Sequence, residues 1–152
     1  MSRPPAVRID DLAAPRFPEE MRPMLDGMAA MAEQVSFESE ALMQLAVDQT
    51  GLTDFGDPGF RERLDVLATA MRTEGRHGPL GKLTVGGMLV QCLRNRLLVE
   101  DLIKRHPEIE RIQIARPIIV CGLPRTGTTH LHNLIAADPA LRSLPYWESL
   151  EP

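Results

Sequence analysis

The chain has 152 residues, 43% of them hydrophobic and 25% charged, so it is long enough to enclose one sizeable hydrophobic core. Its formal net charge of −4 excludes whole-chain attraction to nucleic acid or to an anionic membrane surface. Aromatic residues make up only 4% of the chain, which argues against a platform that stacks nucleic-acid bases.

A proline-rich arm over residues 1–19 is the first predicted segment, and we expect it to be extended. A helical region follows over residues 20–112. Apolar residues recur at helical spacing over 20–35, which predicts the first helix. A second helix is predicted over 39–49, because Gly51 stands just past its end, where a left-handed glycine often stops a helix.

Capping residues indicate where the helices of this region begin. Ser39 is the candidate N-cap of the second helix. Pro58, directly after an aspartate, is predicted at the first position of the third helix. Residues 76–82 contain glycine and proline and are predicted as a loop. Thr84 is then the candidate N-cap of the longest helix, which runs to about Lys104.

Residues 113–152 form the third segment, in which the pattern changes. The apolar run at 117–121 predicts a buried strand. A glycine-rich loop follows over 122–129, and residues 128–137 are predicted as the helix after it. Residues 141–152 are expected to be irregular and to lead to a second strand. The fold class predicted is therefore α/β, with only the opening strand, loop and helix of a P-loop-type parallel sheet after an all-helical N-terminal region.

The loop closely matches the phosphate-binding template G-x-x-x-x-G-K-[ST], with Gly122 and Gly127 at the two glycine positions. Glycines let the backbone approach an anion, while consecutive N–H groups and the helix N-terminus supply positive potential. The template lysine is missing, and Thr128 stands in its place. The cation lies inside the loop instead, as Arg125. This departure argues against a triphosphate as the ligand.

The loop resembles that of the sulfotransferase family, because a basic residue two positions before the second glycine is followed by Gly-Thr-Thr. The likeness is greatest to the bacterial branch with a G-x-P-R-[ST]-G-T-T loop, and its specific part covers residues 117–152. The resemblance implies that the loop binds 3′-phosphoadenosine 5′-phosphosulfate (PAPS). Further positions that look like this branch are Leu131, Leu134, Asp138, Pro139, Arg142, Trp147 and Glu148.

The resemblance also implies roles for individual loop residues. Arg125 takes the place of the basic residue that contacts the 5′-phosphate and the bridging oxygen of PAPS. A planar guanidinium can bind a phosphate with two hydrogen bonds, and it stabilises negative charge that grows on the leaving oxygen. The predicted cofactor-binding residues are Gly122, Pro124, Arg125, Thr126, Gly127, Thr128 and Thr129.

Glu148 is the second predicted catalytic residue, because sulfuryl transfer to a hydroxyl needs a base near the acceptor oxygen. In some sulfotransferases a glutamate that follows the loop helix has this role. An equally supported alternative is a solvated glutamate or a structural partner of an arginine. His130 and His132 lie near the loop and rank below Glu148, since they point about 200° apart on a helix and cannot both face one ligand.

The sequence therefore predicts an enzyme that transfers a sulfuryl group from PAPS to a hydroxyl or amine of a small-molecule acceptor. The acceptor's identity and the oligomeric state, including a homo-oligomer, are left open. Each βαβ unit takes roughly 30 residues, so only about one fits after Pro117. We accordingly expect the chain to be the N-terminal part of a longer enzyme, with its 3′-phosphate site downstream.

Two other functions remain open at this point. One is a P-loop nucleotide or small-molecule kinase, against which the missing lysine argues. The other is a non-catalytic remnant whose helical region binds a partner. The helical region is rich in methionine, which suits varied apolar ligands, although ordinary helix packing is the favoured interpretation.

The cysteines and the N-terminal sequence indicate the cellular compartment of the protein. Cys92 and Cys121 form no Cys-x-x-Cys pair, and the four histidines show no ligand spacing, so we expect buried reduced thiols and no metal site. The N-terminal residues lack the apolar core of a signal peptide, and no apolar run could span a bilayer. The prediction is a cytoplasmic protein without a membrane span.

Overall fold

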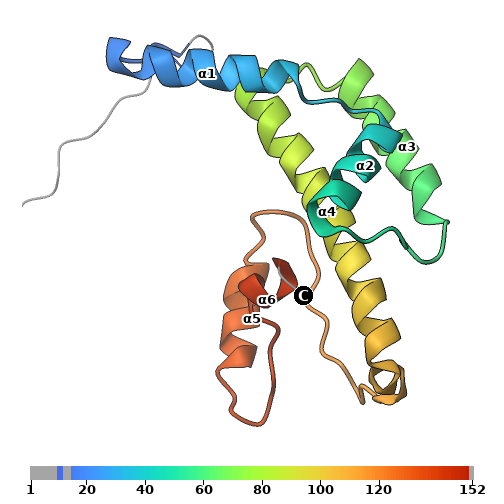
Figure 1. Cartoon of the computed structure of the whole chain (residues 1–152). Helices are drawn as coiled ribbons and strands as arrows, with labels where there is room; N and C mark the ends of the chain where they lie inside the picture. Colours follow the sequence, from blue (N-terminus) through green and yellow to red (C-terminus); the bar gives the residue numbers. More distant parts are fainter. Residues whose placement is uncertain (1–9, 12–14, 151–152) are drawn as a thin grey trace, which may run out of the picture.

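The computed structural model describes residues 10–11 and 15–150. Within these residues the chain is helical and contains no strand (Figure 1). Most of the predicted arm lies outside the described residues, and 15–18 have no regular structure. The elements in order are η1 (Glu19–Met21), α1 (Arg22–Glu33), α2 (Ser39–Thr50), α3 (Phe60–Thr73), α4 (Pro79–Arg105), η2 (Pro107–Arg111), α5 (Thr128–Ala136) and α6 (Tyr146–Leu150).

Helix α4 is the longest element, and α1 and α2 both pack against it. The main hydrophobic core lies between α2, α3 and α4, so the helical region folds around one face of α4. Leu97 on α4 is completely buried there. The buried residues of this core are Leu42, Met43, Ala46, Phe55, Leu64, Ala68, Val90, Leu93 and Leu97.

The start of α4 differs from the sequence prediction. The helix begins at Pro79, with Gly78 as its N-cap, so the second half of the predicted loop is helical. Proline is favoured in the first turn because its φ angle is preset and its missing N–H would have no helical partner. Thr84, expected to cap the helix, lies inside it and donates a hydrogen bond to the Leu80 carbonyl at 2.9 Å.

Other helix boundaries agree more closely with the sequence. Gly51 ends α2 in a left-handed conformation with φ of 70°, and its N–H donates to the Val47 carbonyl at 2.7 Å. Ser39 is the first helical residue rather than the N-cap, which is Glu38. Helix α3 starts two residues after Pro58, at Phe60, because residues 58–59 form a turn.

The segment predicted as a buried strand, residues 117–121, has no regular structure here and is not buried. The side chains of Ile118 and Ile119 are 61% and 80% exposed. A strand needs a neighbouring strand to receive its backbone hydrogen bonds, and the described residues provide none. The sheet is therefore not present among the residues that the structure describes.

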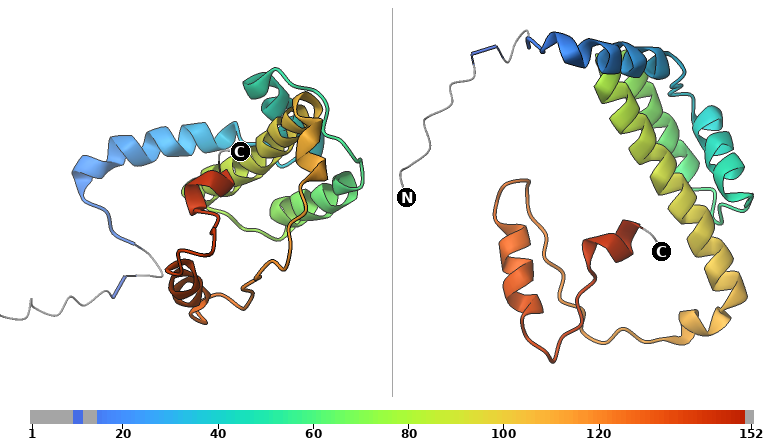
Figure 2. Two further views of the ribbon diagram at one scale, coloured as in Figure 1. Left: turned by 90° about the horizontal axis from the view of Figure 1, so that it is seen from below. Right: turned by 60° about the vertical axis from the view of Figure 1, so that its left-hand side comes forward.

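Helix α5 occupies the position predicted for the helix after the loop, but it is not packed into the core. The side chains of Leu131 and Leu134, two apolar positions of this helix, are 49% and 61% exposed. Residues 141–152 were expected to be irregular, but they contain the short helix α6. The last residue of α6 is bound to α4, because the side-chain amides of Gln91 and Asn95 each donate a hydrogen bond to the Leu150 carbonyl at 2.9 Å. Figure 2 shows α5 standing apart from α4, with α6 between them.

Both cysteines, Cys92 and Cys121, are exposed free thiols, which corrects the expectation that they are buried. Cys92 lies on the outer surface of α4, and Cys121 lies in the unpaired segment before the loop. Among the described residues, no helix is both long and apolar enough to cross a membrane.

Candidate functional site

The loop between residues 122 and 127 makes its turn with two residues in left-handed backbone conformations. Arg125 has φ of 67° and Gly127 has φ of 89°. Between them, the Thr126 hydroxyl donates a hydrogen bond to the Leu123 carbonyl at 2.6 Å. This bond closes the loop on itself, so the turn is held by local contacts rather than by the rest of the fold.

Gly122 allows the loop to lie close to the first turn of α5. A β-carbon at this position would lie 2.9 Å from Cγ2 of Thr128 and 3.0 Å from the Thr126 hydroxyl oxygen. Both distances are shorter than ordinary van der Waals contact, so a side chain at residue 122 would push the loop away from the helix. The first glycine of the motif thus has a steric role that the sequence pattern alone only suggests.

The N-terminus of α5 has no side-chain cap. Gly127 is the N-cap residue, and its carbonyl accepts the first helical hydrogen bond from Leu131 N–H at 3.0 Å. The N–H groups of the first turn have no partner within a helix, and an end of this kind carries partial positive charge. The chain therefore presents free donors at the position where the motif predicts an anion.

Arg125 lies on the exposed side of this turn. No hydrogen bond or ion pair joins its guanidinium to any residue that the structure describes. The cation is thus available to a ligand, and it stands in the turn that leads directly into the first N–H groups of α5. The predicted loop residues, from Gly122 to Thr129, are brought together in this way.

Glu148 is not joined to the loop by any hydrogen bond or ion pair among the described residues. It lies on α6, and its Oε2 accepts a hydrogen bond from the guanidinium of Arg142 at 3.0 Å. The Glu148 side chain is 27% exposed, whereas that of Arg142 is 80% exposed. Of the two roles considered for Glu148, the contact seen is that of a partner for an arginine.

Two contacts around the site were not anticipated from the sequence. Arg142 was noted as a family-like position but not as the partner of Glu148. Gln91 and Asn95, which bind the end of α6, stand four residues apart on α4 and therefore share one face of that helix. That spacing was visible in the sequence, but the acceptor at Leu150 was not.

Comparison with known proteins connects this geometry to a family. The sequence model of the sulfotransferase family matches residues 117–152, which include the loop, α5 and α6. No curated protein matches the chain.

Two solved structures resemble the chain. Sulfotransferase STF1 from Mycobacterium tuberculosis H37Rv superposes with a TM-score of 0.70 at 40% sequence identity, covering 74% of this chain and 32% of that one. Sulfotransferase STF9 from Mycobacterium avium superposes with a TM-score of 0.67 at 35% identity, covering 74% of this chain and 29% of that one. The chain thus spans about a third of the length of the structures that it matches.

Proposed function

We propose that the chain is part of a sulfotransferase, as its similarity to that family indicates, and that it provides the 5′-phosphosulfate loop of an enzyme that transfers a sulfuryl group from PAPS to a hydroxyl or amine. The observation that carries this proposal is the uncapped N-terminus of α5, which follows a left-handed turn containing a free arginine. Anions bind at such helix ends because unpaired N–H groups and the helix dipole both favour negative charge.

The loop residues fit an anionic group on three counts. The first-turn N–H groups of α5 are unpaired, Gly122 leaves room beside the helix, and no carboxylate neutralises Arg125 among the described residues. Arg125 would hold phosphate oxygens with paired hydrogen bonds, and the hydroxyls of Thr128 and Thr129 would add donors. PAPS, when bound, would supply the sulfuryl group.

Arg125 would also act on the reaction itself. Negative charge grows on the oxygen that links phosphate to sulfate as the bond to sulfur breaks. A fixed cation beside that oxygen stabilises the transition state more than the ground state, and this difference is what accelerates a reaction.

Glu148 is proposed as the base that accepts a proton from the acceptor hydroxyl. Its hydrogen bond to Arg142 fixes the carboxylate on α6 through one oxygen, Oε2. The second oxygen has no hydrogen bond to another described side chain and would be free for an acceptor. Arg142 would therefore orient Glu148 without occupying both oxygens.

We further propose that residues 117–121 form the first strand of a parallel sheet whose other strands come from the rest of the protein. The exposed isoleucines of this segment support the proposal, since a strand buried on both faces carries such side chains. The domain organisation proposed is then a helical region over 20–112 and the start of the PAPS-binding domain over 113–152. We propose a cytoplasmic location for the enzyme.

The test of the loop assignment is the affinity of the full-length protein for adenosine 3′,5′-bisphosphate, measured by calorimetry. Arg125→Ala should weaken binding about ten- to a hundredfold, because a hydrogen bond to a charged group contributes about 1.5–3 kcal/mol. Arg116→Ala is a matched control, since Arg116 is also exposed and has a left-handed backbone with φ of 51°. Equal affinities for the Arg125→Ala and native proteins would contradict the proposal.

A further inference from the structure

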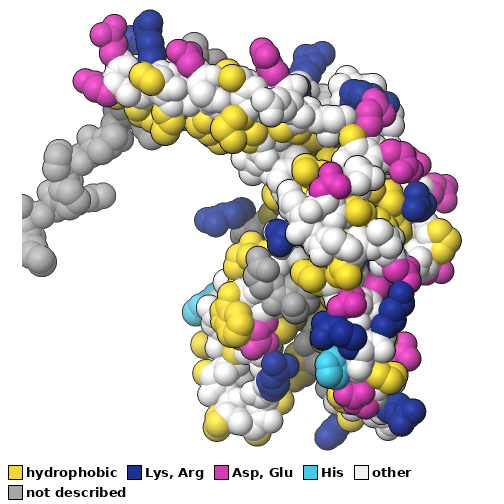
Figure 3. Space-filling view, in the orientation of Figure 1, with side chains coloured by type: hydrophobic (Ala, Val, Ile, Leu, Met, Phe, Trp, Pro, Cys, Tyr) yellow, Lys and Arg dark blue, Asp and Glu magenta, His cyan; other side chains and the backbone are white. Residues whose placement is uncertain are grey.

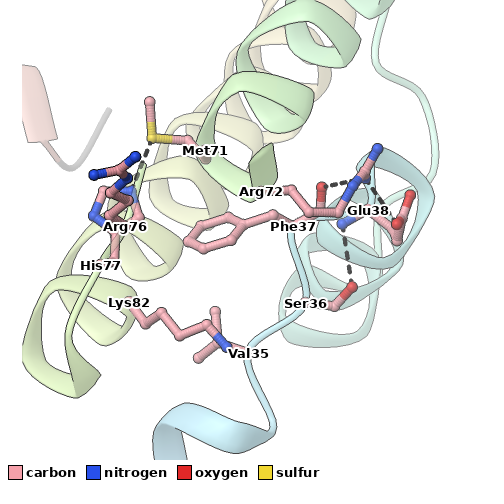
Figure 4. A pocket seen from close by; sticks show the side chains of 9 residues that line it. All are labelled: Val35, Ser36, Phe37, Glu38, Met71, Arg72, Arg76, His77 and Lys82. Carbon is pink, nitrogen blue, oxygen red and sulfur yellow. Dashed lines mark hydrogen bonds and ion pairs between the residues drawn. The ribbon is translucent and has the colours of Figure 1, made fainter. Parts of the chain in front are cut away.

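A concave site lies in the helical region, away from the loop. It is a pocket of about 400 Å³ where the α1–α2 connection, the end of α3 and the start of α4 meet. Figure 4 shows the ring of Phe37 projecting between Arg76 and His77 on one side and Lys82 on the other. None of its lining residues belongs to the loop, α5 or α6.

The pocket carries an excess of positive charge. Its lining contains the cations Arg72, Arg76 and Lys82 and one carboxylate, Glu38, which leaves a net charge of +2 before His77 is counted. Glu38 is already bound, since it forms an ion pair with Arg72 at 2.7 Å. Neither Arg76 nor Lys82 forms a side-chain hydrogen bond or ion pair with another described residue.

Arg76 is held in this position by an unusual backbone. Its φ is 41°, a left-handed value that non-glycine residues adopt rarely and at a cost. The residue before it is Gly75, where a β-carbon would lie 2.3 Å from Nε2 of His77. The glycine therefore lets the His77 ring fold back, and that ring lies 3.3 Å from the Met71 sulfur through Nε2.

A buried aromatic ring lies in the lining of the pocket. Phe37 is 6% exposed, and its ring centroid lies 5.8 Å from that of His77 at an interplanar angle of 46°. The ion pair between Arg72 and Glu38 connects the end of α3 to the residue before α2. Two unpaired cations thus line the same pocket as a buried aromatic ring, an arrangement that suits an anion attached to a small apolar group.

We propose that this pocket binds the phosphate or sulfate group of a small molecule. A phosphate monoester carries about −1.5 to −2 charge at neutral pH, which matches the excess positive charge of the lining. Arg76 supplies a planar fork of donors for two oxygens, and Lys82 supplies a second positive charge in the same lining. The site is distinct from the loop and is independent of the sulfotransferase assignment.

The test uses phenyl phosphate as the probe and the full-length protein. Binding is followed through the ring NMR signals of Phe37 and His77, which report on this pocket and not on the loop. We expect saturable shifts of both signals in the native protein. Inorganic phosphate should compete for the site, whereas benzyl alcohol, which has the ring without the charge, should leave the signals unchanged.

The variants Arg76→Gln and Lys82→Gln should each weaken phenyl phosphate binding about tenfold, the loss expected for one charge-assisted contact. Arg63→Gln removes an exposed α3 cation outside the pocket and should change the affinity less than about twofold. Lys82 has no left-handed backbone, so its variant keeps the test valid if Arg76→Gln fails to fold.

The proposal would be overturned by any of three results. One is the absence of saturable shifts in the native protein, as expected if another part of the protein fills the pocket. Another is equal weakening by Arg63→Gln, which would reveal only general charge attraction. The third is an equal response to benzyl alcohol, because the pocket would then recognise the ring rather than the anion.

Discussion

Three arginines, Arg76, Arg116 and Arg125, have left-handed backbone conformations among the described residues. Residues other than glycine adopt the left-handed backbone region at a cost of order 1 kcal/mol, so the surrounding structure must stabilise each of these three conformations. For Arg125 the Thr126 hydroxyl bond and Gly127 maintain the turn, and next to Arg76 the missing β-carbon of Gly75 leaves room for the His77 ring. The two conformations orient the cations on which the two proposed anion sites depend.

Glu148→Gln should separate binding from turnover. Glutamine keeps the shape and can still accept a hydrogen bond from Arg142, but it cannot take a proton from the acceptor. We expect adenosine 3′,5′-bisphosphate affinity to be unchanged and kcat to fall about 10²- to 10⁴-fold in the full-length enzyme, the usual contribution of a general base. Glu110→Gln, on the exposed surface of η2, is the control. Full turnover in Glu148→Gln would remove Glu148 from the mechanism.

Helix α4 connects most of the described structure. It contacts α1, α2 and η2, contributes three residues to the core, and binds the end of α6 through Gln91 and Asn95. Its apolar residues at 90, 93 and 97 repeat at helical spacing and were visible in the sequence. Its role as the support for α6 was not visible in the sequence, because it depends on the Leu150 carbonyl, which lies 55 residues from Asn95.

Leu97→Ala should destabilise the protein by about 2–5 kcal/mol, because removing a completely buried side chain loses its burial and leaves a cavity. Val99→Ala on the same helix is the control, since Val99 is 38% exposed and its loss should cost less than about 0.5 kcal/mol. Urea denaturation of the two variants provides the measurement. A similar midpoint for both would mean that the core around α4 is loosely packed.

An ion pair between Asp54 and Lys104 joins the α2–α3 connection to the end of α4. The hydrogen bond from Lys104, together with one from Gly56 N–H, holds the pKa of Asp54 below its ordinary value of 3.8. The same bond raises the pKa of Lys104 above 10.5. The stabilisation is therefore present between these values, and it is lost as the pH falls through the lowered pKa or rises through the raised one.

Lys104→Met should lower the denaturation midpoint slightly at pH 7, since both partners are exposed and such pairs contribute little. The difference from the native protein should shrink as the pH falls below 3.8, because the carboxyl group becomes neutral in both proteins. Denaturation curves at several pH values measure this. A difference that stays constant through the acid range would indicate lost packing of the lysine stem instead.

The molecule as a whole exposes a large apolar surface on its C-terminal part. Figure 3 shows apolar side chains along one face of α1 and over the region of α5 and α6. Exposed apolar residues on this part include Ile112, Ile114, Ile118, Ile119, Leu123, Leu134, Tyr146 and Trp147. Many exposed apolar side chains on one segment normally mark contacts with other parts of a protein or with a partner. The proposed sheet would cover the segment before the loop.

Hydrogen exchange on the full-length protein tests this proposal. If residues 117–121 form a central strand, the amide protons of residues 118–121 should exchange orders of magnitude more slowly than those of residues 112–116, which precede the proposed strand. Pro117 itself has no amide proton. The amide of Leu97 in the core of α4 serves as an internal reference for slow exchange. Fast exchange throughout 118–121 would show that this segment remains unpaired in the whole protein.

Local sequence signals were sufficient for the loop, for most helix positions and for the glycine that ends α2, because dihedral preferences and hydrogen bonds a few residues apart govern these features. The start of α4 was predicted wrongly because two local signals, Pro79 and Thr84, competed. Four features could be learned only from the folded chain. They are the Arg142 partner of Glu148, the attachment of α6 to α4, the exposure of both cysteines and the cationic pocket beside Phe37. Each depends on which residues meet in the fold, and the choice of such partners leaves no periodic trace in the sequence.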